Sequence, residues 1–144
     1  MTKPQRTVLI TGASSGIGKA TAQLLLLHGW KVIAAARRTD AMTDLCASGA
    51  KIFPLDITDI QSRQSLVTHV HEQFGVLDAL VNNAGFGEVG PIETMPIQTA
   101  QSLFEVNVFG LIGLTQMLLP GMGKHGKGRI INVSSIAGRF VTPG

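Results

Sequence analysis

Five short apolar runs recur along the 144-residue chain, and each interval between them is long enough for a helix. The runs are 7–11 (TVLIT), 31–36 (KVIAAA), 51–55 (KIFPL), 77–81 (LDALV) and 129–133 (RIINV). Nearly continuous apolar strands joined by helices are typical of a parallel sheet covered on both faces by right-handed crossovers. The sequence therefore predicts an α/β fold, a doubly wound parallel sheet of Rossmann type with about five strands.

Helical patterns fill the intervals. We predict helices over 16–28, 41–48 and 59–74, and a long helix from about residue 96 towards Pro120. In the third helix Leu66, Val70 and Phe74 recur at helical spacing. His69 and His71 lie off that face, so we expect them to be solvated. The long helix has too many apolar residues for one stripe, and we expect it to be buried between the sheet and a neighbour.

Composition restricts the function classes. Apolar residues make up 44% of the chain and charged residues 15%, which indicates a packed globular protein. The net charge is +3, and the twelve Lys and Arg residues form no run longer than Arg37-Arg38. A basic stripe that could follow a phosphate backbone is therefore missing, and nucleic acid is not expected as a partner.

The longest apolar stretch is FGLIGLTQMLLPGM, which is interrupted by Gly113, Gln116 and Pro120. It is shorter than the roughly 20 residues that a membrane span needs, and the first residues do not resemble a signal peptide. We therefore expect a cytoplasmic protein without a membrane span. The lone Cys46 has no disulfide or metal-ligand companion, so no metal site is predicted.

A glycine cluster, TGASSGIGKAT, follows the first predicted strand. Gly12, Gly16 and Gly18 allow a tight turn, expose backbone N–H groups to a pyrophosphate, and let the next helix pack close to the sheet. The positive end of that helix then faces the anion. Glycines after a strand are also ordinary turn residues, so the loop alone is a weak signal.

Two other motifs overlap this loop. A P-loop, G-x-x-x-x-G-K-[ST], fails on spacing because Ile17 stands five residues after Gly12. The order G-x-S-x-G places Ser14 where α/β-hydrolases hold their nucleophile, and Asp78 and His125 follow in the required order. No earlier strand-loop can supply the second oxyanion donor, so a serine hydrolase is a remote alternative.

Four segments together resemble the short-chain dehydrogenase/reductase family. They are TGASSGIG at 11–18, NNAG at 82–85, Asn107 within FEVNVFG, and GRIINVSSIAG at 128–138. The segments cover essentially the whole chain in the family's order and spacing. The resemblance implies an oxidoreductase that transfers hydride between a nicotinamide dinucleotide and a small-molecule carbonyl or alcohol.

The resemblance also implies where the cofactor is bound. The pyrophosphate and its ribose would be held by Gly12, Ser14, Gly16, Ile17 and Gly18. Asp56 would meet the adenine edge. Asn83, Ala84 and Gly85 would line the adenine-ribose side, whereas a purely structural role is a serious alternative for Asn82.

The choice between NAD and NADP is made after the second strand. A carboxylate there binds the ribose hydroxyls of NAD, whereas a guanidinium accommodates the extra phosphate of NADP. The sequence reads Ala36-Arg37-Arg38, which favours NADP over NAD. Two alternatives stay open: Asp40 could reach the ribose, or Arg38 could be a solvated cation that precedes a helix.

The family's catalytic groups are an Asn, a Ser, a Tyr and a Lys. The Asn corresponds to Asn107, for which a structural role in kinking the helix is the alternative. The Ser corresponds to Ser135, because it lies three residues before Gly138, and this leaves Ser134 to cap or hydrogen-bond locally. The chain contains no tyrosine, so the family's Tyr-x-x-x-Lys motif is absent.

We therefore expect residues 1–144 to be a C-terminally truncated dinucleotide-binding domain that lacks the last strands and helices of the family fold and is inactive alone. The alternative is a non-catalytic NADP-binding or interaction module. The strand at 129–133 would form an exposed sheet edge, which favours self-association, and we expect a homo-oligomer.

Overall fold

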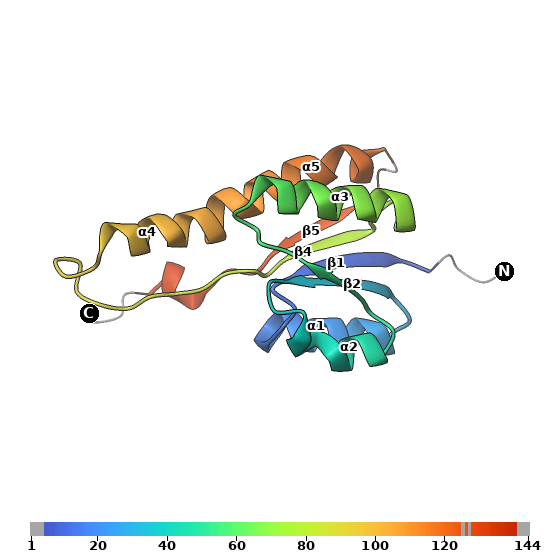
Figure 1. The fold of residues 1–144 in the computed structure, drawn as a ribbon, viewed down its shortest axis with the longest axis horizontal. Helices are drawn as coiled ribbons and strands as arrows, with labels where there is room; N and C mark the ends of the chain where they lie inside the picture. The colour runs from blue at the N-terminus through green and yellow to red at the C-terminus, as the bar shows by residue number, and fades with distance from the viewer. Residues whose placement is uncertain (1–4, 125, 127, 141–144) are drawn as a thin grey trace.

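The computed structural model describes residues 5–124, 126 and 128–140 and shows one parallel sheet between two helical layers (Figure 1). The strands are β1 (Thr7–Thr11), β2 (Lys31–Ala36), β3 (Lys51–Pro54), β4 (Ala79–Asn82) and β5 (Arg129–Asn132). Their order in the sheet is β3-β2-β1-β4-β5, and every neighbouring pair is parallel. The predicted Rossmann-type fold with five strands is confirmed.

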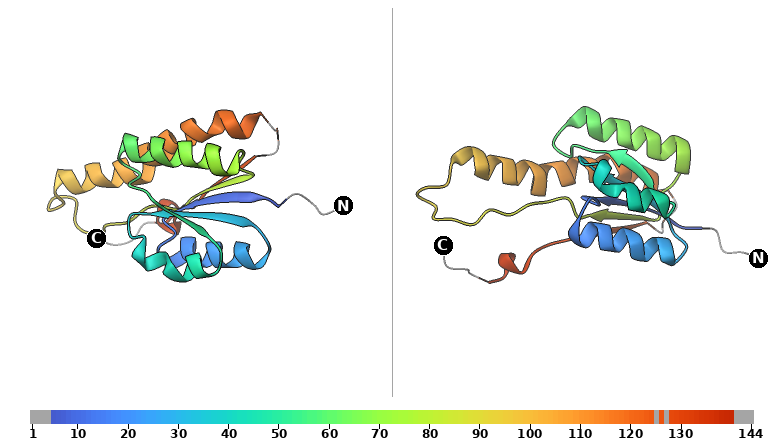
Figure 2. Two further views of the ribbon diagram at one scale, coloured as in Figure 1. Left: turned by 45° about the vertical axis from the view of Figure 1, so that its right-hand side comes forward. Right: turned by 60° about the horizontal axis from the view of Figure 1, so that its bottom comes forward.

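Helices connect the strands on both sides of the sheet. They are α1 (Gly16–Leu27), η1 (Asp40–Met42), α2 (Thr43–Ala47), α3 (Ile60–Phe74), α4 (Ile97–Phe104), the π-helical η2 (Glu105–Gly110), α5 (Leu111–Gly123) and η3 (Ile136–Gly138). Helices α1 and α2 cover one face, and α3 and α5 cover the other, as the views in Figures 1 and 2 agree. Because β1 is the central strand, its carboxyl end lies in the middle of the edge at which all five parallel strands end.

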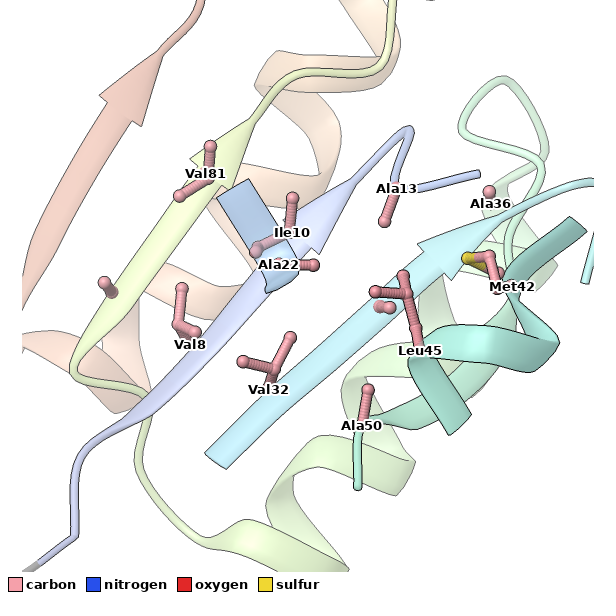
Figure 3. Close-up of a cluster of buried hydrophobic side chains, with 12 residues drawn as sticks. Val8, Ile10, Ala13, Ala22, Val32, Ala36, Met42, Leu45, Ala50 and Val81 are labelled. Atoms are coloured by element: carbon pink, nitrogen blue, oxygen red, sulfur yellow. The ribbon is translucent and has the colours of Figure 1, made fainter. Parts of the chain in front are cut away.

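The central strands supply two cores because successive side chains point to opposite faces of the sheet. Val8 and Ile10 of β1 pack with Val32 beneath α1 and α2, in the cluster shown in Figure 3. Leu9 and Leu80 belong to the second cluster, under α3 and α5. All five residues of β1 are buried. The loop that follows β1 therefore begins from a rigid strand.

The predicted long helix is present, but the expectation that it is buried all round is wrong. Segments α4, η2 and α5 form one continuous helix, Ile97–Gly123, in which Leu114, Leu118 and Met122 face the core. Helix α4 has no buried residue and extends past the sheet (Figure 2). The many apolar residues of this helix therefore lie partly on the face that packs on the sheet and partly on a face that is exposed in this structure.

Within the described part of the chain, this 27-residue helix is the one segment long and apolar enough to cross a membrane by length and composition. The helix agrees with the predicted one, but it is longer than the apolar stretch from Phe109 to Met122 on which the expectation of no membrane span was based. Core helices of water-soluble proteins pass the same test, and one face of α5 packs on the sheet.

Helices α3 and α5 approach closely where glycines of α5 face large polar side chains of α3. A Cβ atom built on Gly113 would lie 3.2 Å from Arg63 Nε, and one on Gly121 would lie 2.7 Å from His71 Cε1. His69 lies half-buried between the rings of Phe53 and Phe74, at centroid distances of 5.0 and 6.2 Å. The expectation of a solvated histidine is therefore wrong for His69, whereas His71 is exposed.

Candidate cofactor-binding site

A cleft of about 370 Å³ opens at the carboxyl ends of β1 to β4. It is lined by Gly12, Ser14, Ser15, Gly16, Ile17, Ala35, Ala36, Arg37, Arg38, Leu55, Asp56, Ile57, Thr58, Asn83, Ala84, Gly85, Phe86 and Val106. The chain runs from β1 outward to β3 and then returns to place β4 on the other side of β1. Ligands of open α/β sheets bind at such a reversal of strand order.

The glycine loop forms the floor of the cleft. Gly12 and Gly16 have φ values of +66° and +54°, in the left-handed region that glycine adopts without a steric penalty. A Cβ atom on Gly12 would lie 2.8 Å from Ala84 Cα, so this position also requires close packing. A Cβ on Gly16 would meet nothing within 4 Å and would take up open space beside the loop. The bare backbone of Gly16 is therefore accessible to a ligand.

The first turn of α1 faces this loop, and no side chain caps its backbone N–H groups. Ser15 is the N-cap, but its side chain makes no capping hydrogen bond, and the first turn of α1 has no acidic residue. The first amides of a helix have no partner within the helix and carry a partial positive charge. This arrangement fits the pyrophosphate of a dinucleotide.

Gly18 was predicted to bind the cofactor, but it does not line the cleft. It is buried, and a Cβ there would overlap Asn83 Nδ2 and lie 2.6 Å from the carbonyl oxygen of Gly12. Its contribution is the close approach of α1 to the end of β4.

The glycine loop is joined to the residues after β4 by hydrogen bonds of Asn83 and of Thr11, the last residue of β1. Asn83 Nδ2 donates to the carbonyl oxygens of Thr11 and Gly12, at 3.0 and 3.2 Å. The buried Thr11 hydroxyl accepts from the backbone N–H groups of Asn83 and Ala84, both at 3.0 Å. Sequence reasoning missed Thr11, although a hydroxyl at the end of a buried strand was the available signal. The loop is thereby held in place before any ligand binds.

Arg37 and Arg38 follow β2 and line the opposite wall of the cleft. Arg38 Nη2 lies 3.5 Å from the hydroxyl oxygens of both Ser14 and Ser15, which gives two long hydrogen bonds. Asp40, the alternative ribose ligand, begins η1 and does not line the cleft. The side chain that reaches across to the glycine loop is therefore cationic.

Asp56 ends the wall formed by β3. The hydroxyl and the backbone N–H of Thr58 donate to Asp56 Oδ1, at 2.7 and 3.0 Å. These hydrogen bonds, together with the nearby charges of Arg37 and Arg63, hold the pKa of Asp56 below its ordinary value. Asp56 is therefore an ionised acceptor at the edge of the cleft.

Asn82, next to the cleft, has a structural environment. It is 2% exposed, and its Nδ2 donates to Asn132 Oδ1 at 2.9 Å and to the Thr115 hydroxyl at 3.0 Å. These bonds connect β4 to β5 and to α5. The geometry favours the structural alternative for this residue.

Asn107 lies in η2, beside the cleft rather than in its wall. Its Nδ2 donates to the Phe86 carbonyl oxygen at 2.8 Å, and its Oδ1 accepts from the Phe86 N–H at 3.1 Å. A Cβ on Gly85 would lie 3.0 Å from that Oδ1, so the glycine makes room for it. The amide of Asn107 thus holds the backbone after NNAG, and Asn107 itself lies in a π-helical turn of the kind that is frequent at functional sites.

Ser135 is exposed and lies outside the cleft wall. It is the N-cap of η3, and its hydroxyl accepts from the Ala137 N–H at 3.1 Å. The local capping role that the sequence assigned to Ser134 therefore belongs to Ser135. The structure brings ten of the predicted cofactor residues together in one cleft, and it leaves Gly18 behind that cleft and the two predicted catalytic residues outside it.

Comparison with known proteins identifies the family. The family pattern described as short chain dehydrogenase matches residues 6–144. The chain belongs to the short-chain dehydrogenase/reductase family. The curated proteins it resembles include a dehydrogenase/reductase SDR family protein 7-like of Anopheles gambiae, which is 40% identical over 96% of this chain and 47% of its own length. A serine 3-dehydrogenase of Rhizobium radiobacter is 38% identical over 93% of this chain and 55% of its own.

Solved structures agree with this placement in the short-chain dehydrogenase/reductase family. A short-chain dehydrogenase from Streptomyces avermitilis has a TM-score of 0.93 and 39% identity, over 97% of this chain and 53% of its own. Serine dehydrogenase from Escherichia coli has a TM-score of 0.89 and 30% identity, over 96% of this chain and 66% of its own. The chain spans about half the length of the curated relatives it matches.

Membership of the short-chain dehydrogenase/reductase family explains the open glycine loop, because this family binds NAD or NADP. The hydrolase alternative has no support in the geometry. Ser14 follows the end of β1, whereas Asp78 Oδ2 accepts from the N–H of Thr7 at its start, at 2.7 Å. A strand rises about 3.3 Å per residue, so this strand separates the two side chains. His125 lies outside the described residues.

No group of three His, Cys, Asp or Glu that could hold a metal ion occurs among residues 5–124, 126 and 128–140.

Proposed function

We propose that this chain is the cofactor-binding part of an NADP-dependent oxidoreductase of the short-chain dehydrogenase/reductase family. The observation that carries the proposal is the position of Arg38, which reaches from the end of β2 to Ser14 and Ser15, whereas Asp40 does not line the cleft. Bound NADP would supply or accept the hydride that converts a carbonyl into an alcohol or the reverse.

The glycine loop would hold the pyrophosphate and the adjacent ribose. The residues proposed for this task are Gly12, Ser14, Gly16, Ile17 and, through packing, Gly18. The uncapped start of α1 would donate backbone N–H groups to the phosphate oxygens, with the helix dipole favouring the negative charge.

Arg37 and Arg38 would recognise the phosphate on the adenosine ribose that distinguishes NADP from NAD. A guanidinium donates two parallel hydrogen bonds to phosphate, and charge-assisted bonds are stronger than neutral ones. Both arginines are exposed in the cleft wall and no acid of the η1 segment lines it, so the wall would attract the extra phosphate.

The adenosine would lie between the ends of β3 and β4. The ionised Asp56 would accept a hydrogen bond at the adenine edge, and Asn83, Ala84 and Gly85 would line the adenine-ribose side. Asn83 has its amide nitrogen committed to Thr11 and Gly12, so it would act mainly by keeping the loop in shape.

For the complete site we propose that Ser135 polarises the substrate oxygen and that Asn107 organises the backbone at Phe86, with a small carbonyl or alcohol as substrate in a homo-oligomeric enzyme. The chain has no tyrosine, so the acid/base group that the family uses is missing from this polypeptide. General acid–base catalysis contributes about 100- to 10,000-fold, and we expect this polypeptide alone to bind cofactor without measurable turnover.

Calorimetric titration of the chain with NADPH and with NADH tests the cofactor proposal. We expect NADPH to bind at least about tenfold more tightly, and Arg38→Gln to remove most of that preference, because a hydrogen bond to a charged group is worth about 1.5–3 kcal/mol. Lys31→Gln is the matched control, since Lys31 is an exposed cation at the other end of the same strand. Tighter binding of NADH, or binding of neither, would contradict the proposal.

A non-catalytic NADP-binding or interaction module is the second candidate, and the absence of tyrosine favours it. The titration gives the same result for both candidates. An assay of NADPH oxidation with a panel of small aldehydes and ketones separates them when it is applied to a longer polypeptide that includes the family's Tyr-x-x-x-Lys motif. Turnover by the present chain at the rates of a complete enzyme would contradict the expected inactivity.

A further inference from the structure

One face of α1 is joined to the segment after β2 by a row of polar contacts. The row is here called the α1–η1 seam. It consists of the N-cap Ser15 with Lys19 and Gln23 of α1, and of Arg38, Ala41 and Asp44 on the facing segment. The α1 residues are spaced by four, so they lie above one another on the helix surface. Of the facing residues, Arg38 precedes η1, Ala41 lies in it and Asp44 lies in α2.

Lys19 is the centre of the α1–η1 seam. Its ammonium donates to the carbonyl oxygen of Ala41 at 3.0 Å and forms an ion pair with Asp44 Oδ1 at 2.8 Å. Asp44 Oδ2 also accepts from Gln23 Nε2 at 3.4 Å. The side chain of Lys19 is 28% exposed, so its cation is partly withdrawn from water and is bound at two points.

Apolar packing and polar contacts hold the segment together. Met42 and Leu45 are fully buried and anchor η1 and α2 in the first core cluster. The hydrophobic effect contributes most of the stabilisation of these two buried side chains. Hydrogen bonds do have direction, and those of Lys19 lie one helical turn below Ser15, which Arg38 contacts.

We propose that Lys19 is a positioning residue for recognition of the extra phosphate of NADP: through Ala41 and Asp44 it holds the 38–44 segment so that Arg38 stays over Ser14 and Ser15. This inference rests on the proposed cofactor preference. Lys19 does not line the cleft, so its effect would be transmitted through Arg38 rather than through a contact with the cofactor.

A simple effect of charge makes a different prediction. If Lys19 only adds positive potential, Lys19→Met should weaken NADPH binding, whereas Asp44→Asn should strengthen it because a negative charge is removed. If Lys19 positions Arg38, both substitutions loosen the α1–η1 seam, and both should weaken NADPH binding. The sign of the Asp44→Asn effect therefore separates the two explanations.

The experiment is calorimetric titration of the wild-type chain and the variants Lys19→Met, Lys19→Arg and Asp44→Asn with NADPH and with NADH. We expect Lys19→Met and Asp44→Asn each to weaken NADPH binding about three- to fivefold, the range of a partly exposed ion pair, and to change NADH binding less than twofold. Lys19→Arg keeps both contacts within reach and should restore most of the affinity. Lys31→Met, remote from the seam, is the control for loss of a cation.

Each other outcome overturns one of the claims. Tighter NADPH binding by Asp44→Asn, or an equal loss for NADPH and NADH, would overturn the positioning role. A wild-type preference for NADPH that all variants keep would overturn it as well. A wild-type chain without that preference would instead overturn the proposed function. Asp44 is half-exposed, so its variant tests the role even where Lys19→Met lowers the melting temperature.

Discussion

Helices α1 and α3 both begin at the carboxyl edge of the sheet, but they differ in how their N-termini are capped. Asp59 caps α3, and its carboxylate accepts from the N–H groups of Gln61 and Ser62, both at 3.1 Å. Ser15 stands at the same place in α1 and makes no such bond. The fold supplies two positive helix ends, and the capping residue decides which of them is available to an anion.

Of the substitutions that test this comparison, Ser15→Asp should have the largest effect, a loss of NADPH affinity. It gives α1 the aspartate N-cap that α3 has. The new carboxylate would accept from the first amides of α1, pair with Arg38 and repel the cofactor phosphates. Two like charges about 4 Å apart at an effective dielectric constant of about 20 repel by roughly 4 kcal/mol, so NADPH affinity should fall at least about 100-fold. Calorimetry measures the loss, and thermal melting should show equal or higher stability.

Ser15→Asn is the matched control for that substitution, since it offers a cap without the charge. It should lose far less affinity than Ser15→Asp. NADPH binding by Ser15→Asp at wild-type strength would show that the start of α1 is not the phosphate site.

Asp59→Ala should have an intermediate effect and act on stability alone. Loss of an N-cap costs about 0.5–2 kcal/mol, which lowers the melting temperature by about 2–4 °C per kcal/mol for a domain of this size. Chemical denaturation of both proteins gives the free energy of unfolding. Asp59→Asn should keep most of the stability, and NADPH affinity should change less than twofold in both variants. A large loss of affinity would mean that the two helix ends are not independent.

Thr58→Val, in the loop that leads into α3, should have the smallest effect, a change in the pKa of Asp56 and in the pH dependence of stability. The hydrogen bond from the Thr58 hydroxyl is the main reason that the pKa of Asp56 is below its ordinary value of 3.8. A carboxyl with a lowered folded pKa adds stability above its unfolded pKa and loses it as pH falls through the folded value. The variant should therefore raise the pKa of Asp56, which carbon-detected NMR titration measures, and its stability should converge with that of the wild type in acid. An unchanged pKa would contradict this.

The sequence predicted all five strands, and it placed the bounds of the first two correctly. Strands Thr7–Thr11 and Lys31–Ala36 agree with the predicted bounds, because their apolar residues are covered on both faces. The positions of the glycine loop and of Arg38 beside one cleft could be predicted, because positive φ, close approach and charge each require particular residue types. These are local requirements, and a sequence records them directly.

Features that depend on how elements pack were missed. The apolar count of α5 did not reveal that only the face with Leu114 and Leu118 meets the sheet. Nor did the sequence show that Lys19 faces Asp44, since 24 intervening residues and a strand bring them together. The cap at Ser135 was assigned to its neighbour because two adjacent serines are equivalent until the backbone chooses one.

The fit of α3 against α5 also has a consequence for how this sequence can vary. A side chain at Gly113 would require Arg63 to shift by a few tenths of an ångström, and one at Gly121 would require the His71 ring to move. A larger residue at position 113 is tolerated when position 63 becomes smaller, and the same holds for 121 and 71, so each pair should change together among related sequences. The four positions should then vary as two coupled pairs rather than independently.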